Sequence, residues 1–313
     1  LNYSYQWYSN ITNNNTGGTP LLGDTNSTYT PSTSTVGTTY YYCVISQGTS
    51  STGCEVISGT AEVIINLGPS FNPQPTGVEV CEGASINALT VNYINGTGTP
   101  QWQWYSNTIN DTIGGTPLVG DTNSTYTPPT TTIGTMYYYC TLILSGSGGC
   151  GKITSNTAQI IVQPNPSIDV NPTTYQMICV GGTIQTPLTV GYINGVGNAS
   201  YQWYSNTTNN NTGGTPLLGD TNSTYTPPVF NVADIFFYYC TVSLDGDGCD
   251  DDTSLVAEIE VANDPIITTQ PLTTQTLCQF ATPNNLSVVA TNGMTGLNYS
   301  YQWYSNITNN NTG

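Results

Sequence analysis

A repeat of about 100 residues runs through this sequence and constrains its fold more than any other feature. The pentapeptide Gln-Trp-Tyr-Ser-Asn occurs four times and places the tryptophans Trp7, Trp104, Trp203 and Trp303. Tyr-Tyr-Cys follows the first three at a nearly constant distance. A repeat of this length is too long for one unit of a solenoid, but it is the size of a whole domain. We therefore expect a tandem array of similar domains.

The two ends of the sequence carry the same stretch, because residues 297–313 are identical to residues 1–17. A terminus rarely falls inside a folding unit, so we expect this sequence to be a window on a longer array. The register of the repeat predicts complete modules at residues 67–164 and 165–263. It also predicts two partial modules, which are residues 1–66, lacking the first strands, and residues 264–313, holding only the first strands.

Each complete module has the pattern of an all-β domain. Helical periodicity is absent, and stretches such as residues 86–93 alternate between apolar and polar side chains. Turn signals such as Asn95-Gly96 separate these stretches. The pattern predicts about seven strands in about 100 residues, which is typical of an immunoglobulin-like β-sandwich. Short connectors that contain proline, such as residues 68–75, predict that the modules form an extended rod.

The spacing of large side chains predicts the core of the sandwich. Trp104 lies thirteen residues after Val91, and Tyr138 and Cys140 follow as Tyr-x-Cys. This order is similar to the tryptophan and Tyr-x-Cys of an immunoglobulin core, with valine at the position of the first core cysteine. We expect these four residues and Trp203 of the next module to be buried.

The composition excludes several functions. The sequence has one basic residue, Lys152, no histidine and a net charge of −17. Binding of nucleic acid or of anionic membrane surfaces needs Lys and Arg, so neither is expected. Without histidine the commonest general base is missing and a Ser-His-Asp triad cannot be built, so we expect no enzyme activity and no cofactor. Nine cysteines at regular positions predict an oxidising, extracellular setting.

Several motifs together resemble the immunoglobulin-like repeats of the giant gliding-motility adhesins of the SprB type. They are Gln-Trp-Tyr-Ser-Asn, Gly-Gly-Thr-Pro-Leu, Tyr-Thr-Pro-Pro and Tyr-Tyr-Cys. The resemblance implies export by the type IX secretion system and display as a cell-surface filament anchored at the outer membrane. It implies as partners the secretion and motility machinery of that membrane, external surfaces or polysaccharides, and the neighbouring modules of the same chain.

We therefore predict a repetitive stalk of an adhesin filament, which displays a binding tip or binds surfaces weakly at many points. One alternative is a structural fibre of an extracellular matrix, and another is a carbohydrate-binding array. An exposed aromatic residue at the same position of every module would favour sugar binding. Polar faces of Asn and Thr would favour a spacer.

The cysteines number three in each complete module, which leaves one odd. The resemblance to bacterial modules of this type implies bridges within a module, from Cys81 to Cys150 and from Cys179 to Cys249. Two alternatives stay open, since sequence does not settle connectivity. One is a bridge between successive modules, and the other is a set of hairpin bridges, namely Cys140–Cys150, Cys240–Cys249 and Cys43–Cys54. Cys140 also fits a buried free thiol.

Two further sites are suggested by local motifs. Carboxylates alternate with glycine near residue 250, which is a pattern that could bind Ca²⁺, although the equivalent loops lack it and a solvated loop is the favoured interpretation. The carboxylates concerned are those of Asp245, Asp247, Asp250, Asp251 and Asp252. The triplet Asp111-Thr112-Ile113 resembles the O-glycosylation motif of that bacterial group, which makes Thr112 a sugar-acceptor candidate.

Overall fold

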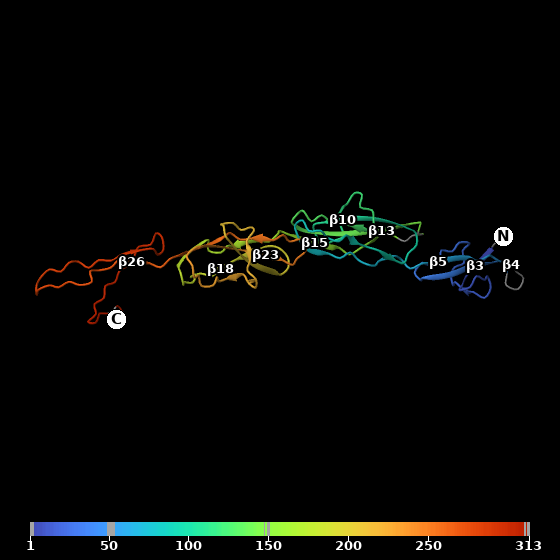
Figure 1. Ribbon diagram of the computed structural model, residues 1–313. Coiled ribbons are helices and arrows are strands. Elements are labelled where there is room, and N and C mark those ends of the chain that lie inside the picture. Colours follow the sequence, from blue (N-terminus) through green and yellow to red (C-terminus); the bar gives the residue numbers. More distant parts are fainter. Residues whose placement is uncertain (1–2, 49–53, 147, 149–150, 310, 312–313) are drawn as a thin grey trace. The chain divides into compact units, whose positions relative to one another are not determined.

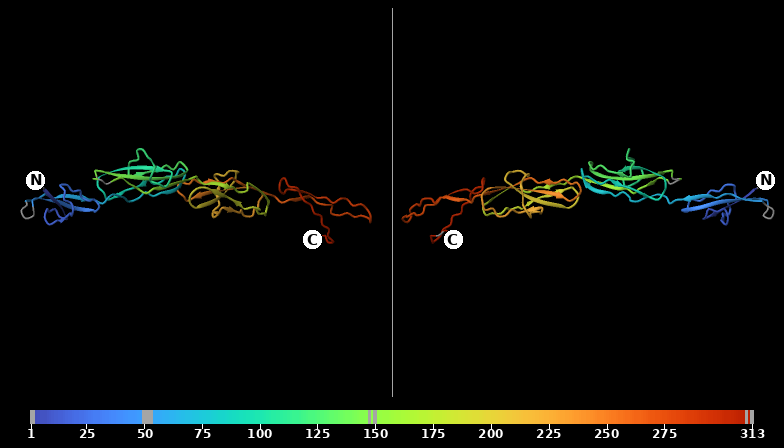
Figure 2. Two further views of the ribbon diagram at one scale, coloured as in Figure 1. Left: turned by 180° about the vertical axis from the view of Figure 1, so that it is seen from behind. Right: turned by 45° about the vertical axis from the view of Figure 1, so that its right-hand side comes forward.

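The structure is a computed structural model, and it describes residues 3–48, 54–146, 148, 151–309 and 311. Every regular element in these residues is a β-strand, and no helical ribbon appears in Figures 1 and 2. The described part therefore has no helix that could cross a membrane. The all-β class predicted from the sequence is confirmed.

The chain divides into two compact units, which are described separately. The first consists of Leu1–Val78, Asn87–Pro128 and Thr135–Ile160, and the second of Glu79–Ile86, Pro129–Gly134 and Ile161–Gly313. Two short pieces of the predicted module at residues 67–164 thus belong to the second unit, together with the residues that follow position 160.

The tryptophan motif forms the same antiparallel ribbon three times. The paired strands are β1 (Tyr3–Asn10) with β3 (Gly37–Gln47), β10 (Thr99–Asn107) with β13 (Gly134–Ser145), and β20 (Ala199–Asn206) with β23 (Ile235–Leu244). The register is also the same, because each tryptophan lies opposite the cysteine of Tyr-Tyr-Cys. Opposite residues project to the same face of a sheet, so tryptophan and cysteine point together toward one side.

Residues 67–164 form one long sheet and two short ones. The long sheet has the order β11-β10-β13-β15-β7, with β14 beside β13, and the short sheets pair β12 with β8 and β6 with β9. The bounds are β6 Ser70–Phe71, β7 Val78–Cys81, β8 Leu89–Thr90, β9 Tyr93–Ile94, β11 Thr116–Pro117, β12 Thr125–Tyr126, β14 Ile153–Thr154 and β15 Ala158–Gln163.

Residues 165–263 repeat this arrangement. The long sheet has the order β17-β25-β23-β20-β21, with β24 beside β23, and the short sheets pair β18 with β22 and β16 with β19. The bounds are β16 Ser167–Val170, β17 Tyr175–Cys179, β18 Leu188–Thr189, β19 Gly191–Ile193, β21 Thr215–Pro216, β22 Thr224–Tyr225, β24 Asp252–Thr253 and β25 Ala257–Ala262. The first strand of the long sheet, β17, runs parallel to the last strand, β25, and the other neighbours are antiparallel.

This strand order is that of an immunoglobulin-like sandwich. In such a sandwich the third, sixth and seventh strands lie side by side in one sheet, and the second and fifth strands belong to the opposite sheet. Here β20, β23 and β25 form the first group, whereas β18 and β22 form the second. The chain therefore contains repeated immunoglobulin-like modules.

The core of each complete module is built around its buried tryptophan. Trp104 and Trp203 have no exposed surface, and each indole N–H donates to a main-chain carbonyl, of Asn123 at 2.9 Å and of Asn222 at 2.8 Å. A buried indole N–H needs such a partner, so the Asn-Ser-Thr turn of the repeat satisfies its core. The other residues expected in the core are also buried, with exposed fractions of 1% for Val91, 4% for Tyr138 and 0% for Cys140.

The partial segments at the two ends share one identical stretch of sequence, but they differ in how much strand structure they form. Residues 3–66 form a sheet in the order β2-β1-β3-β4, with β5 beside β3. In residues 264–309 the described strands are a single pair, and Trp303 is 49% exposed with no strand around it. No Tyr-Tyr-Cys segment follows Trp303 in the sequence, so the strand that pairs with β1 has no counterpart there. The remaining bounds are β2 Thr19–Pro20, β4 Cys54–Ile57, β5 Ala61–Ile65, β26 Ile266–Thr269 and β27 Val289–Thr291.

Candidate functional site

The best-defined site of the second unit is a joint between successive repeats, which we call the joint. It is formed by residues 79–86, which cover the end of β7 and the turn after it, and by residues 245–252, which run from the end of β23 to the start of β24. A disulfide links Cys81 to Cys249, with a Cα–Cα distance of 4.9 Å and a sequence separation of 168 residues. The bond thus connects the repeat at residues 67–164 with the repeat at residues 165–263.

The cysteine on β7 is held in a tight turn. Gly83 has a φ of +86°, a conformation that favours glycine, and its N–H donates to the carbonyl of Thr130 at 3.0 Å. The Thr130 hydroxyl donates in turn to the carbonyl of Ala84 at 2.6 Å, and the Ala84 N–H donates to the carbonyl of Cys81 at 3.2 Å. Cys81 is completely buried by this turn and its surroundings.

The loop that carries Cys249 fits closely against this turn. The Asp247 carbonyl accepts the N–H of Cys81 at 3.0 Å. Gly248 has a φ of +72°, and a Cβ atom added there would lie 2.2 Å from the Cβ of Ala84. Only glycine therefore fits at position 248, for reasons of both backbone conformation and space.

The side chain of Asn165 joins the two halves of the joint. Its amide nitrogen lies 3.4 Å from the Glu82 carbonyl and 3.4 Å from Oδ2 of Asp250, and its Oδ1 accepts the Asp250 N–H at 3.1 Å. The Gln163 carbonyl accepts the N–H of Glu82 at 2.8 Å. The connector between the repeats is thus bonded to both of them.

The acidic cluster contributes hydrogen-bond acceptors to the loop. The Asp245 carboxylate accepts the main-chain N–H of Asn198 at 2.5 Å and its side-chain amide at 3.1 Å, and these bonds lower the pKa of Asp245. Asp252 accepts the N–H of Ile168 at 2.7 Å.

The predicted Ca²⁺ ligands therefore face different partners. Asp245 bonds to Asn198, and Asp250 to Asn165. Asp247 contributes its main-chain carbonyl to the joint. Among the described residues, no three His, Cys, Asp or Glu side chains form a group that could hold a metal ion. Of the remaining candidates, Asp251 belongs to the same loop, and Asp252 is the first residue of β24 and bonds to Ile168.

The observed disulfide corrects the pairing within a module. Cys249 is bonded to Cys81 and Cys179 is free, so the expected Cys179–Cys249 bridge is wrong. The register gives the reason. Cys179 lies beside Ala262 at the end of the sheet where the chain leaves the module, whereas Cys249 follows Leu244 at the opposite end of β23. A strand of ten residues spans about 33 Å, and a disulfide needs Cα atoms within about 7 Å.

The other pairings are corrected in the same way. Cys81 is not available to Cys150, which lies outside the described residues. The Cys240–Cys249 bridge is wrong because Cys249 is bonded elsewhere and Cys240 is free. Cys43 and Cys54 are likewise free, since the register places Cys54 opposite Gln47, four residues along β3 from Cys43. Cys140, the proposed partner of Cys150 in a hairpin bridge, is a free and buried thiol.

The buried thiols belong to the core. Burial raises the pKa of Cys140 and of Cys240 to about 12, so each stays protonated at neutral pH. The N–H of each cysteine donates to a serine hydroxyl, Ser155 and Ser254 respectively, at 2.9 Å. These cysteines therefore act as small apolar residues.

The tyrosines of the repeat are used in packing. Tyr105 stacks on Tyr139 with ring centroids 5.0 Å apart, and Tyr204 stacks on Tyr239 at 4.9 Å. The inner members of these pairs are 3% and 4% exposed, and the Tyr239 hydroxyl accepts the N–H of Gly214 at 2.9 Å. The outer members are half-buried, so this repeated position does not present an open aromatic platform.

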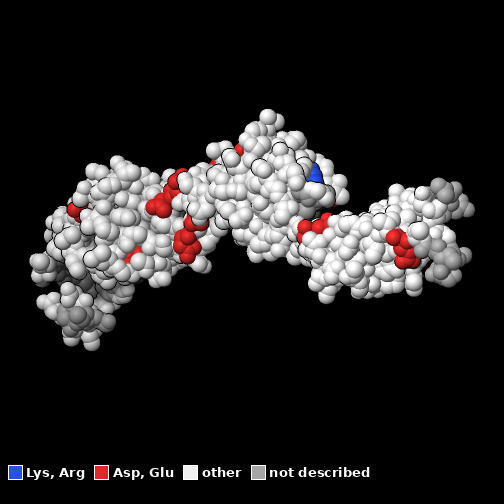
Figure 3. Space-filling view, turned by 90° about the vertical axis from the view of Figure 1, so that its right-hand side faces the viewer, with Lys and Arg blue, Asp and Glu red and all other residues white. Residues whose placement is uncertain are grey.

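Three copies of the repeat instead expose an aliphatic residue at the same position. Leu22 is 89% exposed, Val119 97% and Leu218 91%, all at the same turn after Thr-Pro-Leu. Charge is sparse on the face seen in Figure 3, where acidic patches are separated by uncharged surface and the blue residue is Lys152.

The predicted glycosylation site lies in an ordered turn. The Asp111 side chain accepts the N–H of Ile113 at 2.9 Å, and Thr112 between them is half-buried. Modification of Thr112 stays a prediction.

Residues 75–164 match a family described as a domain of unknown function (DUF8696). Among curated proteins, none matches the chain. Similar solved structures include a three-immunoglobulin-domain titin fragment, I67–I69 (TM-score 0.42, 15% identity, 65% of this chain and 69% of that one), and Drosophila OTK extracellular domains 3–5 (TM-score 0.35, 19% identity, 83% and 86%). The immunoglobulin-like assignment rests on the strand order and register described above.

Proposed function

We propose that this chain is a segment of an extracellular stalk that carries tension between a cell and a surface. The observation that supports this function best is the Cys81–Cys249 disulfide, which joins successive repeats covalently. Disulfides persist in oxidising environments outside the cytosol, which favours an extracellular location.

The bond changes the path of a pulling force. Tension on the two ends of the chain enters at Cys81, crosses the sulfur atoms and leaves at Cys249. The polypeptide between these cysteines, which includes both Trp104 and Trp203, is then bypassed. Such shielding is useful in a stalk, whereas a domain that only binds a ligand in solution does not need it.

The same stalk serves adhesion in gliding motility in our proposal. The repeat would belong to a filament of the SprB type, exported by type IX secretion and anchored at the outer membrane. Surfaces or polysaccharides would be its external partners, and the chain would act without catalysis. Many weak contacts along one filament add up through effective concentration.

Retention on surfaces tests the adhesive role. The chain and a tandem duplicate of it are passed over glass and over a polysaccharide gel, with bound protein measured after washing. Adhesion through many weak contacts predicts retention that rises steeply from the single to the duplicated chain. Equal retention of the two would contradict it.

A structural matrix fibre is the second candidate, and the half-buried tyrosines favour it over a sugar-binding array. Saturable binding of a soluble oligosaccharide to the single chain would reverse that order. Retention of neither chain on any surface would leave the stalk without an adhesive role of its own.

A further inference from the structure

Cys179 lies in the same structural environment as Cys81, although it is free. Both cysteines end the first strand of the long sheet, β17 and β7. The next residue donates to the end of the last strand in each case, from Val180 to the Ala262 carbonyl at 3.0 Å and from Glu82 to the Gln163 carbonyl at 2.8 Å.

The following turn is also repeated. The N–H of Gly181 donates to the Phe230 carbonyl at 2.7 Å, as the N–H of Gly83 does to Thr130. The N–H of Gly182 donates to the Cys179 carbonyl at 2.9 Å, as the N–H of Ala84 does to Cys81. The main chain therefore holds Cys179 in the same conformation and surroundings as the bonded Cys81.

The segment after residue 263 approaches Cys179 in the way that residues 165–263 approach Cys81. In the Asn292-Gly293 turn, the N–H of Gly293 donates to the carbonyl of Asn263 at 2.9 Å. The N–H of the equivalent Gly195 donates to the carbonyl of Pro164 at 3.0 Å. Asn292 and Asn194 share a φ of 66°.

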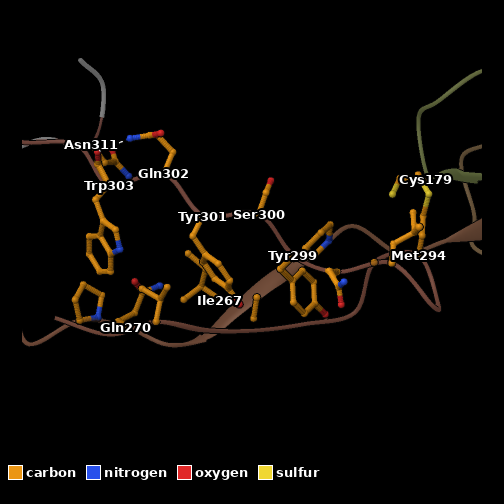
Figure 4. A pocket seen from close by; sticks show the side chains of 17 residues that line it. Cys179, Ile267, Gln270, Met294, Tyr299, Ser300, Tyr301, Gln302, Trp303 and Asn311 are labelled. Atoms are coloured by element: carbon orange, nitrogen blue, oxygen red, sulfur yellow. Dashed lines mark hydrogen bonds between the residues drawn. The ribbon is translucent and has the colours of Figure 1, made fainter. Parts of the chain in front are cut away.

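The residue after this turn indicates where a cysteine that could bond to Cys179 would lie. Met294 and Cys179 line one pocket of about 760 Å³ (Figure 4). At the completed joint the equivalent residue is Val196, whose carbonyl oxygen lies 3.5 Å from the sulfur of Cys249. A cysteine equivalent to Cys249 would thus come next to Cys179.

We propose that Cys179 is one half of a second inter-module disulfide, and that its partner is the counterpart of Cys249 in a following module. Cys278 would bond one module further on, and Cys54 to a first-strand cysteine of a preceding module. The array is then a ladder in which every module is bonded to both neighbours. This pairing does not depend on the adhesive role.

The bond forms by oxidation of two thiols. Each sulfur loses a proton, the pair loses two electrons, and an oxidant of the disulfide class is reduced to two thiols in exchange. In the test below, oxidised glutathione is that oxidant.

The ladder has a mechanical consequence. Cys278 follows Cys249 by 29 positions, so the covalent path along two modules consists of one disulfide and 29 residues. These residues extend to at most about 100 Å. Two folded modules measure about 80 Å, from strands of up to ten residues with their end loops. Complete unfolding would therefore lengthen the array by only about a quarter.

The repeat itself supplies the experiment. Residues 297–313 are identical to residues 1–17, so a copy of residues 18–66 appended after Gly313 completes the fourth module. The appended copy of Cys54 is the counterpart of Cys249, and Cys54→Ser in the original position keeps the two distinguishable. The full chain is refolded with reduced and oxidised glutathione, alkylated, and mapped by mass spectrometry without reduction.

We expect Cys179 bonded to the appended copy of Cys54, with Cys81–Cys249 retained. In the chain without the extension, Cys179 should be alkylated. The control Cys179→Ser should leave the appended cysteine alkylated and Cys81–Cys249 intact.

Cys179 alkylated in the extended chain, or bonded to Cys249, would overturn the proposal. Folding of the extension is checked by a second variant that appends residues 214–263 instead, since these residues complete the folded module at residues 165–263 in the structure. If Cys179 stays free in both variants while Cys81–Cys249 forms, the ladder is wrong and the single joint remains.

Discussion

Reduction of the Cys81–Cys249 bond should release a large and calculable length of chain under force. The bond closes a loop with a sequence separation of 168 residues, and its Cα atoms are 4.9 Å apart. An extended chain spans about 3.3–3.6 Å for each residue, so the loop hides about 550–600 Å. When the chain is pulled from residues 1 and 313 until fully unfolded, we expect a contour length of about 480–520 Å oxidised and about 1,030–1,120 Å reduced.

Optical tweezers with handles at both termini measure this difference directly. A chain with Cys81→Ser should show the full reduced length without any reductant, and Cys249→Ser should show the same. Cys179→Ser is the matched control and should leave the oxidised length unchanged.

Bridges within the modules would give a different result. Two loops of about 70 residues would each hide about 230–250 Å, and Cys81→Ser would then release only one of them. A half-release of this kind would refute the inter-module bond, as would equal lengths before and after reduction.

Three further predictions concern the core and the joint. Cys140 and Cys240, with a pKa of about 12, should resist alkylation at pH 8 in the native chain and react once it is unfolded, whereas the exposed Cys54 and Cys278 should react at once. Burial raises the pKa of Tyr126 to about 12, above its value of about 10 in an unfolded chain. Its contribution to stability is therefore complete below pH 10 and is lost as the pH rises toward 12. The melting temperature should fall between pH 9 and pH 11, and it should fall less in Tyr126→Phe. Gly248→Ala should reduce the yield of Cys81–Cys249 on refolding, because the new Cβ meets Ala84, while Gly120→Ala, at a positive φ but in open space, should leave the yield unchanged.

Much of the module could be predicted from its sequence. The spacing from Val91 to Trp104 and on to Cys140 predicted one shared core, because alternation in strands fixes which side chains face inward. The period of the tryptophans likewise predicted similar domains in tandem, and the structure has the same ribbon with the same register three times.

The alternation pattern could not predict which cysteines pair. Alternation does not reveal the direction of a short first strand, and β17 runs parallel to β25, which puts Cys179 at the far end of the module from Cys249. The order of the cysteines along the repeat is compatible with either pairing. Asn165, Ala84 and Gly248 were missed as joint residues for the same reason, since they meet only across two repeats.

Local sequence also did not determine strand formation. Residues 3–10 form β1, whereas the identical stretch around Trp303 is not a strand. The difference is that β1 has β3 as a partner, and strand structure depends on such pairing more than on intrinsic preference.

A single tryptic cut tests the inter-module disulfide most directly. The sequence offers trypsin one site, after Lys152, which is exposed and lies between Cys81 and Cys249. Free thiols are first blocked with N-ethylmaleimide, and the cut chain is then run on a denaturing gel with and without reductant. Lys152→Gln controls for cleavage elsewhere.

We predict that residues 1–152 and 153–313 stay joined as one full-size band without reductant and separate into two bands with it. Every bridge within a module, including Cys81–Cys150 and Cys179–Cys249, lies on one side of the cut. Two bands without reductant would therefore contradict the covalent joint between repeats.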